Sequence, residues 1–296
     1  MSIPVIIIGG FLGAGKTTVV NRLLRHAAER IAVLVNDFGP LNIDEALLAR
    51  EGEVFALANG CVCCSIGPDF SATLSRILAM EPAPERIIVE ASGVSDPWRI
   101  AQLVKLNKGA RLDAVLVLAD ALELPAQYAD RWLRDTLERQ IARADVICLS
   151  KCDIAHETAR NAAYATLNAI RPGVSVIEIA NGVLPQGLMT PLHERKASAL
   201  IADAPGHDIG QWSWTPPGPL DEARLRAALA ALPASIWRGK GLLTLTDGRR
   251  LVLQLVGRRW SLGPYDGAAP DALVLLGTGE MPLDAELARQ FAAALA

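Results

Sequence analysis

The sequence contains no apolar run approaching the roughly 18 uninterrupted residues of a membrane-spanning helix, although 51% of its 296 residues are hydrophobic. It shows no charged leader with a cleavage site, as in a signal peptide, before the first strand-like run. Its net charge is −3 with both signs mixed, which is not the basic balance typical of nucleic-acid binding. We therefore expect a cytoplasmic protein whose partners include neither a membrane nor nucleic acid.

Cysteine is also sparse, and its placement is informative. Five cysteines, three of them within four residues, do not resemble a secreted disulfide framework. Those three are Cys61, Cys63 and Cys64, and thiolates suit borderline metals such as Zn²⁺ or Co²⁺. We predict a metal site on this loop, with one coordination position left for water, another side chain or a partner protein. The alternative, reduced cysteines with no ligand, fits Cys148 and Cys152 better, because Cys is often a small buried hydrophobe.

The most informative stretch that is present runs from Ile6 to Asn21. Residues 10–17 read GFLGAGKT, which matches the P-loop pattern G-x-x-x-x-G-K-[ST]. Its glycines let backbone N–H groups approach phosphate oxygens. Lys16 can reach the β- and γ-phosphates, and the Thr17 hydroxyl can ligate Mg²⁺. A helix predicted over Thr17–Arg30 would direct its positive end towards the phosphates.

The alternative interpretation of this stretch is a glycine-rich turn that binds nothing. It does not account for a complete motif between an apolar strand and a helix. We therefore predict that the chain binds a nucleoside triphosphate, and the residues expected to contact it are Gly10, Gly13, Ala14, Gly15, Lys16, Thr17 and Thr18.

Apolar strand-like runs alternate with helical patterns over the first 180 or so residues. After the strand that ends in the P-loop, strands are predicted at Ile31–Asn36, Val54–Leu57, Ile87–Val89, Ala114–Leu118, Val146–Leu149 and Val174–Ile179. Apolar strands between helices predict a mostly parallel sheet covered on both faces. The polar motifs follow the carboxyl ends of these strands, where open α/β sheets bind ligands.

The stretch 185–218 is rich in proline and has little periodicity, so we predict a linker there. Beyond it, helices are predicted at Leu220–Leu232 and Leu283–Leu295, with strand-like runs at Gly241–Thr246, Arg250–Val256 and Leu273–Leu276. This mixture predicts a small α+β domain. The expected fold is an α/β P-loop NTPase domain with a mostly parallel sheet at 1–184, the linker at 185–218 and the smaller C-terminal domain at 219–296.

A second motif, RIIVEASG, ends in an acidic residue followed by a tight, small-residue turn. A P-loop enzyme needs an acidic group at the end of a neighbouring strand to organise Mg²⁺ or the attacking water. Glu90 is the candidate, and the Gly93 N–H could approach the γ-phosphate. The alternative is a helix N-cap formed by Ser92 or Ser95, with acidic Asp96 after it.

A third motif, SKCD, follows the strand Val146–Leu149. It resembles the guanine-specificity sequence Asn-Lys-x-Asp of GTPases, in which the Asp accepts hydrogen bonds from guanine and the Lys stem covers the ring. Lys151 and Asp153 match this pattern, whereas Ser150 replaces the Asn. The alternative is a solvated loop after a strand.

Taken together, GGFLGAGKTT, NDFG, GCVCC, EASG with DP, and Lys-x-Asp occur in the order found in the CobW-type P-loop GTPases, which the chain resembles. That group includes cobalamin-biosynthesis proteins, zinc chaperones and nitrile-hydratase activators, and it is related to the GTPases that insert nickel into urease and hydrogenase. The resemblance covers almost the whole chain, because Trp237–Gly241 and Leu273–Gly277 are similar to the family's C-terminal domain.

The resemblance implies a Mg²⁺-dependent GTPase that hydrolyses GTP to GDP and phosphate. It also implies delivery of Zn²⁺ or Co²⁺ to a client metalloprotein or cofactor-biosynthesis enzyme, and a nucleotide-dependent homodimer. Matched by position, Lys16, Asp37 and Glu90 would be catalytic, with Asp37 in a switch region and Glu90 as the Walker-B-type carboxylate. Lys151 and Asp153 would bind the base.

Three departures from the family pattern affect these expectations. Pro40 stands where many relatives have an acidic residue, and Ser150 replaces the Asn of the guanine motif. A histidine-rich loop common before the C-terminal domain is missing, since His193 and His207 are isolated.

Two other functions stay open from the sequence. A metal sensor or storage protein could use the nucleotide only to gate metal binding, and slow, metal-insensitive turnover without a client would indicate it. A P-loop kinase for a small molecule would need a lid or an acceptor site, and we find neither pattern in the sequence.

Overall fold

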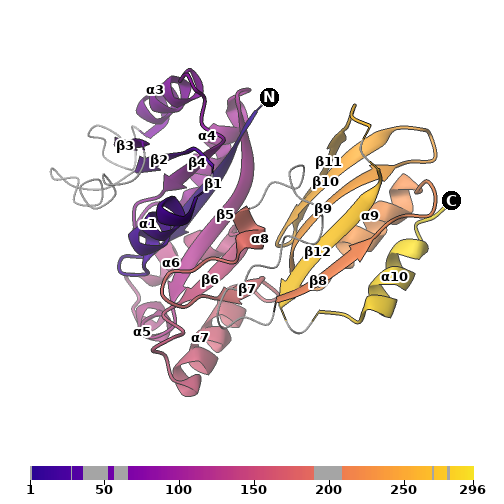
Figure 1. The fold of residues 1–296 in the computed structure, drawn as a ribbon. Helices are drawn as coiled ribbons and strands as arrows, with labels where there is room; N and C mark the ends of the chain where they lie inside the picture. Colours follow the sequence, from indigo (N-terminus) through magenta and orange to yellow (C-terminus); the bar gives the residue numbers. More distant parts are fainter. Residues whose placement is uncertain are drawn as a thin grey trace. The chain divides into compact units, whose positions relative to one another are not determined.

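The computed structural model divides the chain into two compact units (Figure 1). One comprises Met1–Pro172 and Glu178–Leu184, and the other comprises Gly173–Ile177 and Pro185–Ala296. The structure describes residues 2–27, 29–35, 53–56, 66–189, 209–268, 270–278 and 281–296.

The first unit is built on a seven-stranded sheet in the order β3-β2-β4-β1-β5-β6-β7, although residues 176 and 177 of the edge strand β7 are grouped with the other unit. Its strands are β1 Ile3–Gly10, β2 Ile31–Val35, β3 Glu53–Ala56, β4 Arg86–Glu90, β5 Ala110–Asp120, β6 Val146–Ser150 and β7 Val176–Glu178. Its helices are α1 Lys16–His26, α3 Ile66–Leu78, α4 Pro97–Leu106, α5 Leu124–Ala129, α6 Arg134–Ala142 and α7 Glu157–Ile170. The neighbouring strands from β3 to β6 pair in parallel, which confirms the predicted α/β fold.

The central strand β1 determines which motifs meet. Residues 5–8 are fully buried, as expected for a parallel strand covered on both faces. β1 pairs with β4 on one side, where Ile8 lies opposite Glu90, and with β5 on the other. β5 pairs in turn with β6, where Asp120 lies opposite Ser150. The carboxyl ends of β4, β1, β5 and β6 therefore lie side by side.

Some elements of this unit differ in length from the prediction. α1 ends at His26 rather than Arg30, because Ala27 already has an extended backbone. β5 begins four residues before the predicted Ala114. Charged Arg111 and Asp113 concealed that extension, but Asp113 is 3% exposed and pairs with both Arg86, at 3.4 Å, and Arg111, at 3.6 Å.

The second unit is an antiparallel sheet of five strands in the order β11-β10-β9-β12-β8. Its strands are β8 Ile209–Trp214, β9 Ile236–Thr244, β10 Arg250–Val256, β11 Arg259–Pro264 and β12 Ala272–Thr278. Its helices are α8 Gln186–Met189, α9 Glu222–Ala230 and α10 Asp284–Ala292. The predicted small α+β domain is confirmed, and α9 and α10 cover one face of its sheet (Figure 1).

The core of this unit lies between that face and the two helices. It includes Leu225 and Leu229 of α9, Leu287 of α10 and several strand leucines. Two strands, β8 and β11, were not anticipated, and β8 lies inside the stretch expected to be a linker. Its signal was the spacing of Trp212 and Trp214, because residues two apart share one face of a strand. Both rings pack on Phe291, with ring centroids 5.5 and 6.0 Å apart.

Candidate nucleotide-binding site

The P-loop connects β1 to α1, and Lys16 folds back along it. The Lys16 side chain is 9% exposed, and its Nζ donates to the carbonyl oxygens of Gly10, at 3.0 Å, and Phe11, at 3.3 Å. The Ala14 N–H closes a turn onto the Phe11 carbonyl at 3.2 Å. The ammonium group is therefore held at the first half of the loop, where a phosphate group can replace the carbonyls as its partner.

The second half of the loop forms an open cradle. Gly13 and Gly15 have φ angles of +79° and +91°, which side chains rarely adopt. A Cβ atom added at either glycine would meet no described atom within 4 Å. α1 begins directly after Gly15, no described side chain caps it, and its first turn has no acidic residue. Helix N-termini of this kind bind anions, so the cradle fits phosphate groups.

Glu90 meets the start of α1 from the end of β4. The Thr17 Oγ1 donates to Glu90 Oε1 at 2.8 Å, and Glu90 is 2% exposed. A hydroxyl and a carboxylate are hard oxygen donors, which Mg²⁺ prefers. The residues present therefore fit the magnesium ion that a P-loop nucleotide site requires. The neighbouring Thr18 faces Gly182, where an added Cβ would lie 3.0 Å from Thr18 Cγ2.

The loop after Glu90 contains a helix cap, but neither serine forms it. Asp96 is the N-cap of α4 and accepts from the Trp98 N–H at 2.9 Å. The Ser95 Oγ instead donates to the Ser92 carbonyl at 2.9 Å and closes the turn around Gly93. The N-cap interpretation thus applies to Asp96 and does not involve Glu90.

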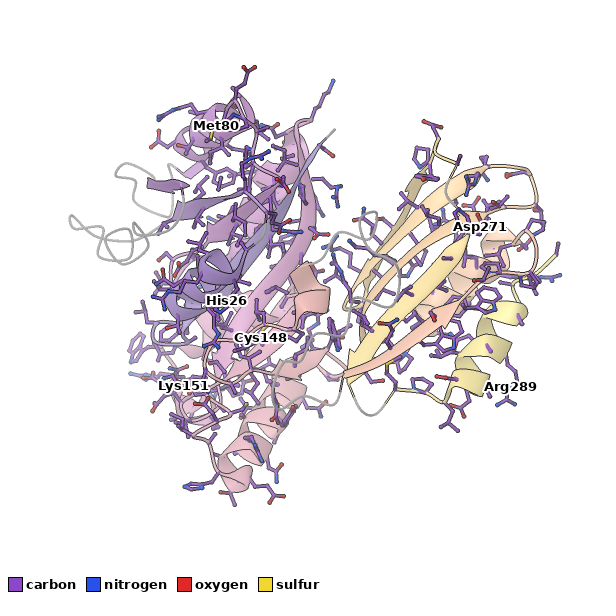
Figure 2. The ribbon with its side chains drawn as sticks, in the orientation of Figure 1. His26, Met80, Cys148, Lys151, Asp271 and Arg289 are labelled. Atoms are coloured by element: carbon purple, nitrogen blue, oxygen red, sulfur yellow. The ribbon has the colours of Figure 1, made fainter. Side chains whose placement is uncertain are left out.

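The third motif lies at the ends of β5, β6 and β7. Lys151, labelled in Figure 2, has a left-handed backbone, with φ 61°. Its Nζ pairs with Asp120 Oδ2 at 2.6 Å. Asp153 Oδ1 accepts from the Asn181 N–H at 3.3 Å. The Ser150 hydroxyl donates to the Ala119 carbonyl at 3.1 Å, so it joins β6 to β5. Asp120 and Asn181 were absent from the predicted site, although both stand at the ends of predicted strands.

The two described cysteines behave as core residues. Cys148 is fully buried on β6, and Cys152 is 8% exposed with its thiol donating to the Leu149 carbonyl at 3.2 Å. Burial raises the pKa of each thiol to about 12. Both thiols are therefore protonated near neutral pH and are poor metal ligands.

The remaining predicted site residues lie outside the part of the chain that the structure describes. They are Asp37, Cys61, Cys63 and Cys64, and the same holds for Pro40, His193 and His207. Within the described residues, no three His, Cys, Asp or Glu side chains come together as a metal site. No helix in the described ranges is both long and apolar enough to span a membrane.

Comparison with known proteins shows similarity along both units. Residues 4–178 match the family model "CobW/HypB/UreG, nucleotide-binding domain", and residues 209–295 match "Cobalamin synthesis protein cobW C-terminal domain". The zinc chaperone CobW of Pseudomonas aeruginosa is 30% identical over 239 residues, which cover 69% of this chain and 64% of that protein.

The zinc-regulated GTPase metalloprotein activator 1 of Dictyostelium discoideum is 30% identical over 223 residues, 62% of this chain and 47% of that protein. The chain thus spans less than two thirds of the length of either relative. A crystal structure of a zinc-bound triple mutant of the YjiA GTPase covers all of both chains at 22% identity, with a TM-score of 0.45. On the strength of the two family matches, the chain belongs to the CobW/HypB/UreG family, with a CobW C-terminal domain following its nucleotide-binding domain.

Proposed function

We propose that this chain is a Mg²⁺-dependent GTPase that binds Zn²⁺ or Co²⁺ through Cys61, Cys63 and Cys64 and delivers the metal to a client protein or cofactor-biosynthesis enzyme. The proposal that the chain binds and hydrolyses GTP is supported above all by the Thr17–Glu90 hydrogen bond beside the open glycine cradle. The proposal that the chain binds and delivers a metal is supported by the thiol triplet in the sequence and by two relatives whose names specify zinc.

In the proposed reaction, the chain's own residues hold and orient GTP. Lys16 would exchange the carbonyls of Gly10 and Phe11 for the β- and γ-phosphates. The N–H groups of the cradle and the first turn of α1 would surround the remaining phosphate oxygens. Thr17 and Glu90 would hold Mg²⁺, which supplies positive charge next to the phosphates when bound. Glu90 would also orient the water that attacks the γ-phosphate.

Guanine selection is proposed for the edge formed by Lys151 and Asp153. The Lys151–Asp120 ion pair directs the Lys151 stem across the ends of β5 and β6, where a planar base can lie on it. Asp153 is exposed and carries a carboxylate that can accept from guanine N1 and the exocyclic amine. The hydrogen bond that the Asn181 N–H donates to Asp153 Oδ1 steadies that carboxylate.

Asp153→Asn should shift the preference from GTP towards xanthosine triphosphate. The amide keeps the size of the side chain but places a donor opposite the guanine donors. GTP affinity should fall about a hundredfold, roughly 2.8 kcal/mol, while the xanthine C2 carbonyl gains a donor. Isothermal titration with GTP, ATP and xanthosine triphosphate measures this.

The matched control for this experiment is Asp130→Asn. Asp130 also accepts a backbone N–H, from Trp132 at 2.8 Å, on an exposed loop. It should leave all three affinities unchanged. Equal affinity of the wild type for ATP and GTP would contradict guanine selection and favour the kinase alternative.

Coupling between nucleotide binding and metal binding would link GTP hydrolysis to metal release. If bound GTP orders the thiol loop, the three thiolates are preorganised and the metal affinity rises. Linkage then requires the metal to tighten GTP binding by the same factor. Hydrolysis would reverse the effect and release the metal to a client.

Zn²⁺ and Co²⁺ should bind about tenfold more tightly in the presence of a non-hydrolysable GTP analogue than with GDP, roughly 1.4 kcal/mol. Binding should weaken below neutral pH, because thiolate ligation releases protons. A competitive titration with a metal chelator dye in each nucleotide state measures this. The triple variant Cys61→Ala, Cys63→Ala, Cys64→Ala should lose the site.

Cys148 and Cys152 stay in the triple variant and serve as internal controls, because their protonated thiols should not bind metal. Unchanged metal affinity in the triple variant would remove the proposed site. Equal affinity in both nucleotide states, with slow and metal-insensitive GTP turnover, would instead indicate a metal sensor or storage protein.

A further inference from the structure

Gln140 on α6 is a buried polar residue with contacts to the loop that follows Glu90. Its side chain is 2% exposed, and its Nε2 donates to the carbonyl oxygens of Gly93, at 3.1 Å, and Ser95, at 2.9 Å. Both hydrogens of the amide group are thus used on one loop, 45 and 47 residues away in the sequence.

The orientation of this amide follows from its partners. Of the two ends of a glutamine amide, only the NH₂ group can donate to carbonyl oxygens, so Nε2 must face the loop. The Oε1 is buried and finds no hydrogen-bond partner among the described residues. Leaving a buried acceptor unpaired is unfavourable, and such exceptions in native proteins require an explanation. The two carbonyls of the loop therefore determine which way the amide points.

The loop that Gln140 holds is fastened at both ends. The Ala91 N–H donates to the Ile8 carbonyl at 2.9 Å, and Asp96 caps α4. Gly93 lies between these anchors and packs directly on the P-loop. A Cβ added at Gly93 would lie 2.5 Å from Leu12 Cδ2 and 3.0 Å from the Leu12 backbone nitrogen. Gly93 is therefore held between Gln140 on one side and Leu12 on the other.

Leu12 belongs to the half of the P-loop where the Lys16 ammonium lies, at the carbonyls of Gly10 and Phe11. A P-loop lysine reaches the β- and γ-phosphates. Under the proposed function, this half of the loop therefore receives the terminal phosphate of GTP. The Gly93 backbone packs against Leu12 and therefore lies at that end of the site, three residues after Glu90 in the chain.

We infer that Gln140 is a positioning residue that holds Gly93 against the P-loop, and that it thereby determines how strongly the site prefers the triphosphate over the diphosphate. The inference rests on the proposed GTP site. The γ-phosphate is the only part of GTP that GDP lacks. Loss of the Gln140 contacts therefore weakens triphosphate binding selectively, because the Gly93 N–H is no longer held where that phosphate binds.

Gln140→Met tests this with a side chain of similar volume and no donors. The affinity for a non-hydrolysable GTP analogue should fall about tenfold, roughly 1.4 kcal/mol, while GDP affinity should stay within about twofold. The Asn side chain of Gln140→Asn is one methylene shorter and can reach at most one of the two carbonyls. The affinity of this variant for the GTP analogue should therefore lie between those of Gln140→Met and the wild type. Calorimetric titration of the full chain with both nucleotides and Mg²⁺ measures the ratio of the affinity for the GTP analogue to the affinity for GDP.

Arg139→Met is the matched control on the same helix, because Arg139 is exposed and its ion pair with Asp135 lies on the surface. It should leave the ratio of the two affinities unchanged. An equal fall for GDP and the analogue in Gln140→Met, or no fall in either, would overturn the inference. If Gln140→Met does not fold, the ratio in Gln140→Asn decides in the same way. A wild type that binds neither nucleotide would instead contradict the proposed function.

Discussion

Lys16→Ala should abolish measurable binding of both GTP and GDP, with affinities at least about a hundredfold below the wild type. The substitution removes the cation that can form charge-assisted hydrogen bonds to the phosphates, which are about twice as strong as neutral ones. In the free protein it also removes the hydrogen bonds from Lys16 Nζ to the Gly10 and Phe11 carbonyls, which is an effect on the stability of the P-loop and not on its affinity.

Calorimetry with both nucleotides measures this loss, and thermal unfolding shows whether the variant is folded. Lys108→Ala is the control, since Lys108 is exposed on the turn after α4. Wild-type nucleotide affinity in a folded Lys16→Ala variant would contradict the assignment of residues 10–17 as the phosphate site.

Glu90→Gln should lower GTP turnover about a hundredfold to a thousandfold while GDP affinity stays nearly unchanged. The amide oxygen can still accept the Thr17 hydroxyl, so the link between β4 and α1 persists. The change removes the negative charge that would hold Mg²⁺ and orient water, and a positioned acid–base group typically contributes 10²–10⁴-fold in rate. The difference between turnover and binding separates a catalytic role from a structural one.

The measurement is phosphate release at saturating GTP, with Glu85→Gln as the matched control. Glu85 precedes β4 and forms an exposed ion pair with Arg30 at 3.4 Å, and pairs of this kind contribute little to stability. If Glu90→Gln turns over GTP at the wild-type rate, another residue must act as the carboxylate of the site. Asp37, which lies outside the described residues, would be the next candidate.

The sequence predicts those parts of the candidate site that are local in the chain. A glycine pattern, a lysine and a threonine within eight residues identify the P-loop, because the backbone there needs those residue types. Glu90 was predictable for the related reason that it ends an apolar strand. The parallel sheet followed from the alternation of such strands with helices.

The contacts that depend on packing between distant segments could not be predicted. Gln140 has no motif around it, and its contacts depend on α6 bringing it to a loop 45 residues earlier in the sequence. Asp120 becomes relevant only because β5 and β6 pair in the register that places it next to Lys151. Similarly, β8 was missed because its strand signal is carried by only two tryptophans within a proline-rich stretch.

The central place of β1 also determines how the site responds to thermal fluctuation. Its backbone hydrogen bonds run to β4 on one side and β5 on the other, and its middle residues are fully buried. Amide hydrogens in such a strand exchange with solvent only when the whole unit unfolds, whereas amides in loops exchange through local openings. The alignment of Ile8 with Glu90 therefore lasts as long as the native state of the unit. The P-loop starts from this fixed strand, so local motion at this end of the site is confined to the P-loop itself.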